Sequence, residues 1–374
     1  MPAYLDNAAT TPVCAQAVQA ALDAMTAGFG NPSSGYAAGK TALERLNADR
    51  AAVSAALGCS PEELFFTSCG TEGDNWAIQM GAESGKRRGR HIITTVAEHA
   101  AVLEPVKALE GLGWEVTRLK TDRTGHVSVE DFAAALRSDT VLVSMMLVNN
   151  ETGAVFPVAE CARLAKERNP ALLFHTDAVQ AFLKVPFTPD KLGVDLLTIS
   201  GHKVRAPKGI GALYIRKGVK LCPLLVGGGQ ERGLRPGTEP TAQISALAAA
   251  CQAWNPAYPE HIAALKHYAL ERLAGIPGLE IVSRGDAPHI CAISLPGYPS
   301  EMLVRDLSDR GVYVSSGSAC HRGKPSHVFA TMGLPKRILT GMLRISFSPD
   351  NTHEEVDALY EGLNAITKER ISAR

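Results

Sequence analysis

Short apolar runs alternate with helix-length amphipathic segments over the first 215 residues of this chain. The apolar runs lie at 64–67, 91–95, 115–119, 141–148, 172–176, 195–200 and 211–215. The amphipathic segments lie at 36–57, 71–83, 100–111, 129–136 and 158–168. This alternation is typical of a mostly parallel sheet with helices on both faces. We therefore predict an α/β fold with a seven-stranded sheet, whose ligands should bind beyond the carboxyl ends of the strands.

The pattern changes after residue 215. A glycine-rich loop at 227–237 precedes helical segments that begin near 241 and at 259. Strand-like runs at 290–295, 312–315 and 342–347 then mix with helices at 300–310 and from 352 onward. We predict a large domain over 14–255 and a smaller α+β domain made of 1–13 and 256–374.

Composition excludes several classes of function. The chain has 374 residues, with 38 Lys plus Arg against 38 Asp plus Glu, so we expect no direct nucleic-acid binding. The N-terminus lacks a signal-peptide pattern, and the longest apolar run, 141–148, is too short to cross a bilayer. Eight scattered cysteines without a C-x-x-C pair disfavour a disulfide framework and a zinc ribbon. We expect a cytoplasmic protein with no membrane association and no metal site.

Two predicted strand ends carry an amine and an acid. Lys203 follows the run 195–200, and Asp177 follows the run 172–176. Alone, Lys203 is equally compatible with a surface position, and Asp177 with a turn or a helix N-cap. Together they match what pyridoxal phosphate requires, a lysine for a Schiff base and an acid beside the pyridine nitrogen.

Three further segments add candidate groups. Gly70 and Thr71 follow a strand and open a helix, which is a natural phosphate position, although a plain helix start is the simpler interpretation of these two residues alone. His99 lies at another strand end, where a structural role is the commoner one. Cys320 ends a Ser/Gly loop and is followed by His321 and other basic residues, which would favour a reactive thiolate.

Ten motifs, in this order, together resemble the cysteine desulfurases. They are YLDNAATTP at 4–12, FGNPS at 29–33, FTSCGTE at 66–72, EH at 98–99, VNNETG at 148–153, DAVQ at 177–180, SGHK at 200–203, GGGQERG at 227–233, RPGT at 235–238 and SSGSAC at 315–320. The resemblance is to the NifS/IscS-like group I enzymes, which are class V members of the fold-type I pyridoxal-phosphate enzymes. It runs almost from end to end of the chain.

The resemblance implies roles around the cofactor ring. Lys203 is similar to the Schiff-base lysine, and Asp177 to the partner of the pyridine nitrogen. Gln180 is similar to the partner of the ring hydroxyl. His99 resembles the histidine that stacks on the ring and takes part in proton transfer, and Asn150 lies near both ring and substrate.

The resemblance also implies a phosphate site and a homodimer. Gly70, Thr71, Ser200 and His202 would hold the phosphate. Thr238 would reach the phosphate from the other subunit of the dimer.

The implied activity is conversion of L-cysteine to L-alanine. Arg344 is similar to the arginine that binds the substrate carboxylate, and Cys320 to the nucleophile that becomes a persulfide. The sulfur would pass to an acceptor protein, an iron–sulfur scaffold or a thiolation enzyme. Selenocysteine lyases and aminotransferases of the same class share Lys203 and Asp177, so the Cys320 loop is the discriminating feature. A catalytically silent subunit is disfavoured because Lys203 and Cys320 are both present.

Overall fold

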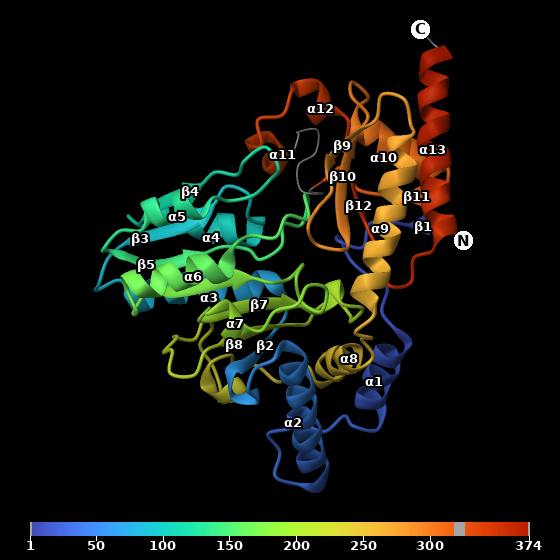
Figure 1. Ribbon diagram of the computed structural model, residues 1–374. Coiled ribbons are helices and arrows are strands. Elements are labelled where there is room, and N and C mark those ends of the chain that lie inside the picture. Colours follow the sequence, from blue (N-terminus) through green and yellow to red (C-terminus); the bar gives the residue numbers. More distant parts are fainter. Residues whose placement is uncertain (1, 318–325, 373–374) are drawn as a thin grey trace.

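The computed structural model describes residues 2–317 and 326–372. Its largest sheet has seven strands in the order β2-β8-β7-β6-β5-β3-β4 (Figure 1). The strands are β2 (Leu64–Thr67), β3 (His91–Thr95), β4 (Glu115–Leu119), β5 (Thr140–Ser144), β6 (Leu173–Asp177), β7 (Leu196–Ser200) and β8 (Gly211–Ile215). All pairings are parallel except those of β8, which runs antiparallel to both β2 and β7. The predicted α/β class and strand number are confirmed.

Helices cover both faces of this sheet. Because neighbouring residues of a strand point to opposite faces, Leu142 and Val143 of β5 enter different apolar clusters. The Leu142 side packs against α3 (Gly70–Gly85) and α4 (Ala100–Gly111), through residues such as Trp76 and Val102. The Val143 side packs against α5 (Val129–Ala135) and α6 (Val158–Arg168), through residues such as Phe132. The strands are therefore buried on both faces, as a parallel sheet requires.

The apolar run at 141–148 is a strand over only part of its length. After β5 ends at Ser144, the N–H groups of Met145 and Leu147 still donate to β6 carbonyls. On the opposite side, however, the Met146 N–H donates to the Glu98 carboxylate, because β3 has already ended at Thr95. The prediction of a strand to residue 148 was therefore too long.

Three helices pack together below the sheet in Figure 1. They are α1 (Ala15–Thr26), α2 (Ala37–Leu57) and α8 (Thr241–Gln252). A short helix, α7 (Pro189–Leu192), precedes β7. Helices α1 and α7 were not predicted. None of the helices in the described ranges combines the length and the apolar character that a membrane span would need.

The C-terminal part builds a second apolar core. Its three-stranded antiparallel sheet has the order β12-β10-β9, and a parallel pair joins β1 to β11. The strands are β1 (Ala3–Tyr4), β9 (Glu280–Ser283), β10 (Ile290–Ser294), β11 (Val312–Tyr313) and β12 (Met342–Ser346). The helices are α9 (Tyr258–Ala274), α10 (Ser300–Asp309), α11 (His327–Thr331), α12 (Lys336–Thr340) and α13 (His353–Ser372). Leu5 packs into this core beside Leu343, so the N-terminal segment lies against the end of the chain.

Candidate active site

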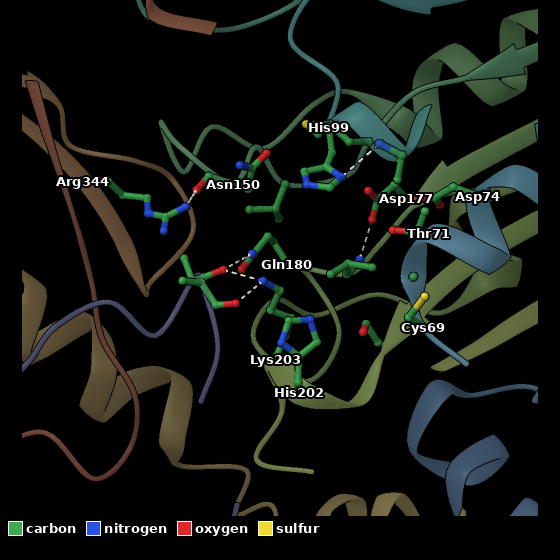
Figure 2. Close-up of a pocket in the computed structure, with 18 of the residues that line it drawn as sticks. Cys69, Thr71, Asp74, His99, Asn150, Asp177, Gln180, His202, Lys203 and Arg344 are labelled. Atoms are coloured by element: carbon green, nitrogen blue, oxygen red, sulfur yellow. Dashed lines mark hydrogen bonds between the residues drawn. The ribbon is translucent and has the colours of Figure 1, made fainter. Parts of the chain in front are cut away.

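A cavity of about 270 Å³ lies at the carboxyl ends of the parallel strands (Figure 2). This is close to the lower end of the usual range for small-molecule sites, roughly 300 Å³. Ten of the residues that the sequence singled out line it: Gly70, Thr71, His99, Asn150, Asp177, Gln180, Ser200, His202, Lys203 and Arg344. Strand ends, a helix start and β12 thus bring together residues from distant parts of the chain.

Lys203 approaches the cavity from the turn that follows β7. Its Nζ donates to the carbonyl oxygens of Ala8 and Ala9, each at 2.7 Å. Burial and, to a smaller extent, the nearby Arg344 guanidinium lower the pKa of Lys203 to about 8, although the carboxylates of Asp6 and Asp177 oppose this shift. An amine with this pKa is far more readily neutral than an ordinary lysine.

Asp177 ends β6, and His99 is the N-cap of α4. The Val179 N–H donates to Asp177 Oδ1 at 2.8 Å, and burial raises the Asp177 pKa while that bond, His99 and Lys203 oppose the rise. His99 Nδ1 accepts the Ala101 N–H at 3.1 Å. Burial lowers the pKa of His99, so the neutral ring carries its proton on Nε2.

The start of α3 forms one end of the cavity. Its N-cap residue, Cys69, makes no side-chain capping bond, so the first backbone N–H groups of this helix are available to an anion. Gly70 packs closely here, since an added Cβ would lie 2.9 Å from Val179 Cγ2. The same added Cβ would lie 3.6 Å from Ser200 Cβ, and both Ser200 and His202 line the cavity. Burial lowers the pKa of His202 to about 3, so this side chain is neutral.

Asn150 and Arg344 form the opposite end of the cavity (Figure 2). Arg344 donates through Nη1 to the Asn150 carbonyl oxygen at 2.9 Å and through Nη2 to Asp6 Oδ1 at 2.7 Å. The Asn150 Oδ1 atom and the Arg344 Nε atom are both buried without a hydrogen-bond partner. Unsatisfied polar atoms in the wall of a cavity are suited to a polar ligand.

Gln180 lies between Lys203 and Asn150 in the view of Figure 2. Its Nε2 donates to the Ala8 carbonyl oxygen at 2.9 Å, the same oxygen that Lys203 contacts. Its Oε1 lies 3.2 Å from His289 Nε2.

The structure does not bring the predicted Thr238 to this cavity in the single chain. Thr238 is exposed in the segment before α8 and does not line the cavity. Cys320 lies outside the described residues. Gly317, three residues before it, lines the cavity and has a φ of 107°, a left-handed conformation that favours glycine.

The sequence interpretation missed several groups at the site. Asp74 lines the cavity one turn into α3, and burial together with the Asp177 carboxylate raises its pKa well above the usual value. The carbonyl oxygens of Ala8 and Ala9, which accept hydrogen bonds from Lys203, were also missed. Both residues belong to the motif at 4–12, so its DNAATT pattern could have indicated them. Asp74 had no such signal, because a polar residue inside a helix is usually exposed.

No group of three or more His, Cys, Asp or Glu side chains within the described ranges is arranged to bind a metal ion. The chemistry of the cavity is that of an amine, a carboxylate, an imidazole and an anion-binding helix start. This set suits an organic phosphate cofactor that carries a carbonyl group and a ring nitrogen.

Comparison with known proteins gives consistent results. The Aminotransferase class-V family pattern matches residues 3–359. The cysteine desulfurase IscS of Methanosarcina thermophila is 43% identical, over 98% of this chain and 92% of that protein. A solved structure described as a NifS-like protein has a TM-score of 0.93 at 38% identity, covering 98% of this chain and all of that one. A second, SspA in complex with cysteine, has a TM-score of 0.82 at 33% identity, covering 93% and 99%. Fold, cavity and relatives agree that this chain belongs to the cysteine desulfurase family of class V aminotransferases, which are pyridoxal-phosphate enzymes.

Proposed function

We propose that this enzyme binds pyridoxal phosphate and converts L-cysteine to L-alanine, leaving the sulfur as a persulfide on Cys320. The observation that carries the proposal is the convergence of Lys203, Asp177 and the start of α3 on one cavity. The relative solved with cysteine bound supports cysteine as the substrate.

The cavity offers a partner for each polar part of the cofactor. The Lys203 amine suits the aldehyde, the Asp177 carboxylate suits the ring nitrogen, and the uncapped N-terminus of α3 with Thr71 suits the phosphate. The buried, unpartnered Oδ1 of Asn150 is a further polar atom that a ligand can satisfy. When bound, pyridoxal phosphate supplies an electron sink for the bonds at the substrate α-carbon.

The protein's own side chains would transfer protons and bind the substrate. Lys203, with its pKa lowered to about 8, can take a proton from the substrate α-carbon at Nζ. The Nε2–H of His99 is available for proton transfer at the cavity wall, since Nδ1 accepts a backbone hydrogen bond. The Arg344 guanidinium suits the substrate carboxylate, for which charge-assisted hydrogen bonds are the strongest available.

Sulfur transfer needs one nucleophilic cysteine. The Cys320 thiolate attacks the substrate sulfur, the carbon–sulfur bond breaks and a sulfur–sulfur bond forms. The carbon that loses sulfur gains a hydrogen, so L-cysteine and a thiol give L-alanine and a persulfide without an external oxidant. Gly317 lines the cavity, which supports the proposal that Cys320 acts there. The other candidates are less suitable, because burial raises the thiol pKa to about 12 and so disfavours the thiolate in Cys59, Cys161, Cys251 and Cys291.

We also infer a homodimer, a cytoplasmic location and transfer of sulfur to an acceptor protein. We propose that the second subunit covers exposed apolar side chains on α1, on the α1–α2 connection and on the loop after β8, and we call this set the dimer face. Its members are Val18, Leu22, Met25, Phe29, Tyr36, Leu225 and Val226. The seven cysteines among the described residues are all free, which suits a reducing compartment.

The direct test is alanine formation from L-cysteine by the purified, cofactor-loaded protein in the presence of a thiol reductant. We expect many turnovers for the wild type and background activity for Cys320→Ala. The exposed Cys222 provides the matched control, and Cys222→Ala should keep full activity. Full activity of Cys320→Ala would contradict the persulfide step. Absence of alanine from a cofactor-loaded wild type would contradict the reaction and favour another class V activity.

A further inference from the structure

Behind the cavity wall, His289 and Gln180 form a buried hydrogen-bonded pair. His289 is 1% exposed and immediately precedes β10, so it comes from a part of the chain distant from Gln180. Gln180 is 4% exposed and lines the cavity. The pair is joined by His289 Nε2 and Gln180 Oε1, 3.2 Å apart.

The hydrogen-bond pattern fixes the orientation of both side chains. The Ala8 carbonyl can only accept, so the Gln180 atom that faces it at 2.9 Å must be the amide nitrogen. The Gln180 atom facing His289 is therefore the carbonyl oxygen, and His289 Nε2 must carry a hydrogen.

His289 has a single hydrogen to give. Burial and the cations of Lys184, Lys266, Arg344 and Lys203 lower its pKa well below the ordinary histidine value. A neutral ring with its hydrogen on Nε2 has a bare Nδ1, and Nδ1 is indeed buried without a hydrogen-bond partner. The unpartnered Nδ1 and the orientation of Gln180 thus both fit the His289 tautomer with its hydrogen on Nε2.

We propose that His289 is a positioning residue that holds the Gln180 amide with its N–H side toward the bound cofactor. This inference rests on the proposed pyridoxal-phosphate function. One hydrogen of Gln180 Nε2 goes to Ala8, and the second is left for the cavity. Gln180 is thereby fixed as a donor to the hydroxyl oxygen of the ring, which favours the deprotonated hydroxyl because an anionic oxygen is the stronger acceptor. Without His289, only the Ala8 carbonyl opposes a rotation of the amide that would present its carbonyl oxygen instead.

The arrangement also couples Gln180 to Lys203. Both side chains donate to the Ala8 carbonyl oxygen, as Figure 2 shows. A rotation of the Gln180 amide would place its oxygen against that carbonyl, which is repulsive. His289 therefore stabilises the contact that lies next to the reactive amine.

The test compares His289→Phe with His289→Gln. Phenylalanine keeps the ring but removes the donor, whereas glutamine can restore an N–H near the position of Nε2. The matched control is His91→Phe, because His91 is also fully buried and bonds through both ring nitrogens, to Thr140 and Thr117, at the opposite end of the sheet. The measurements are pyridoxal-phosphate affinity of the apoprotein, the pH midpoint of the visible band of the bound cofactor, and thermal stability.

We expect His289→Phe to weaken cofactor binding about three- to tenfold, the effect of one lost hydrogen bond. The pH midpoint should move upward, because the lost donor stabilised the negative charge of the ring oxygen. His289→Gln should restore both values toward those of the wild type. His91→Phe should lower the melting temperature while leaving affinity and midpoint unchanged.

Two outcomes would overturn the inference. Unchanged affinity and midpoint in His289→Phe would do so, and so would equal changes in His91→Phe. Failure of the wild type to take up pyridoxal phosphate would instead overturn the proposed function, and this inference with it. If His289→Phe does not fold, ¹⁵N-histidine spectra of the holoenzyme decide, with the His289 signal identified by its loss in His289→Gln. A hydrogen on Nε2 supports the inference, and one on Nδ1 overturns it.

Discussion

Three basic side chains lie at or near the cavity. Lys203 and Arg344 line it, and Lys184, whose Nζ is buried and unpartnered, is close enough to Lys203 for their charges to interact. Burial and the Lys203 charge lower the pKa of Lys184 to about 7. This concentration of positive charge disfavours protonation of Lys203 and favours an anionic ligand.

The Lys203 pKa predicts a pH-dependent stability of the apoprotein. The folded-state pKa of about 8 is below the unfolded value of 10.5, so between these values the unfolded chain binds the extra proton. Stability from this group therefore rises with pH over that window, by at most about 3 kcal/mol. Relative to Lys203→Met, the apo wild type should be less stable at pH 7.5, and the difference should shrink toward pH 10.

Chemical denaturation of both apoproteins at several pH values measures this difference. The exposed Lys217 provides the control, since Lys217→Met should show no such pH dependence. A stability difference between wild type and Lys203→Met that stays constant from pH 7.5 to 10 would contradict a depressed lysine pKa.

At the scale of single residues, sequence could identify groups at strand ends but not their neighbours. Lys203 and Asp177 were predicted because the carboxyl ends of parallel strands meet at one edge of the sheet. His289 and Asp74 were not, because their contacts with Gln180 and Asp177 depend on how β10 and α3 pack in three dimensions. The role of Cys320 stays a prediction.

At the scale of elements, the segment after β5 is organised by one asparagine. Asn149 is fully buried, and its Oδ1 accepts the N–H groups of Glu151 and Thr152, both at 2.9 Å. Its Nδ2 donates to the Ala97 carbonyl at 2.9 Å, next to the start of α4. This residue therefore sets the backbone that carries Asn150, whose carbonyl oxygen in turn binds Arg344.

We expect Asn149→Ala to lower the free energy of unfolding by about 2 to 4 kcal/mol, because it leaves buried N–H groups without an acceptor. It should also raise the KM for L-cysteine, since Arg344 loses a fixed partner at the proposed carboxylate site. Denaturant unfolding and steady-state kinetics check both effects. Asn169→Ala, which removes bonds at the opposite end of the sheet, should leave KM unchanged. An Asn149→Ala enzyme with wild-type stability and KM would contradict this role.

Sequence periodicity located most helices and strands, but it could not show where a side chain takes over the backbone hydrogen bonds of a neighbouring strand. The predicted helices at 100–111 and 158–168 match α4 and α6 from end to end. The run at 141–148 misled because Met146 and its neighbours stay apolar and buried after the strand ends. Only the folded structure shows that the Glu98 carboxylate takes the place of a neighbouring strand.

At the scale of the whole molecule, the two ends of the chain share one core. Ala3 and Leu5 pack with residues from 262 to 366, while the helices α1, α2 and α8 pack under the large sheet. We propose on this basis the two-domain division into 14–255 and the remainder. The division places Ala8 and Ala9 in the smaller domain, so their hydrogen bonds with Lys203 join the two domains.

The dimer face predicts that two copies of this chain associate and that the cofactor site depends on the association. Phe29 is 75% exposed and Val226 is fully exposed, which is unusual for large apolar side chains of a monomer. Charge repulsion and desolvation should therefore separate the subunits of a Phe29→Glu, Val226→Glu double variant. Light scattering should give about twice 39.7 kDa for the wild type and 39.7 kDa for the variant.

Cofactor affinity then shows whether the two subunits only touch or whether each contributes a residue to the cofactor site of the other. If the partner subunit's Thr238 contributes to the phosphate site, the monomeric variant should bind pyridoxal phosphate more weakly, and Thr238→Ala should weaken binding while the protein stays dimeric. Leu112, 71% exposed at the end of α4, is the matched control, and Leu112→Glu should change neither mass nor affinity. A wild type of 39.7 kDa with full affinity would show that one chain completes the site alone, and the exposed apolar residues would then need another occupant.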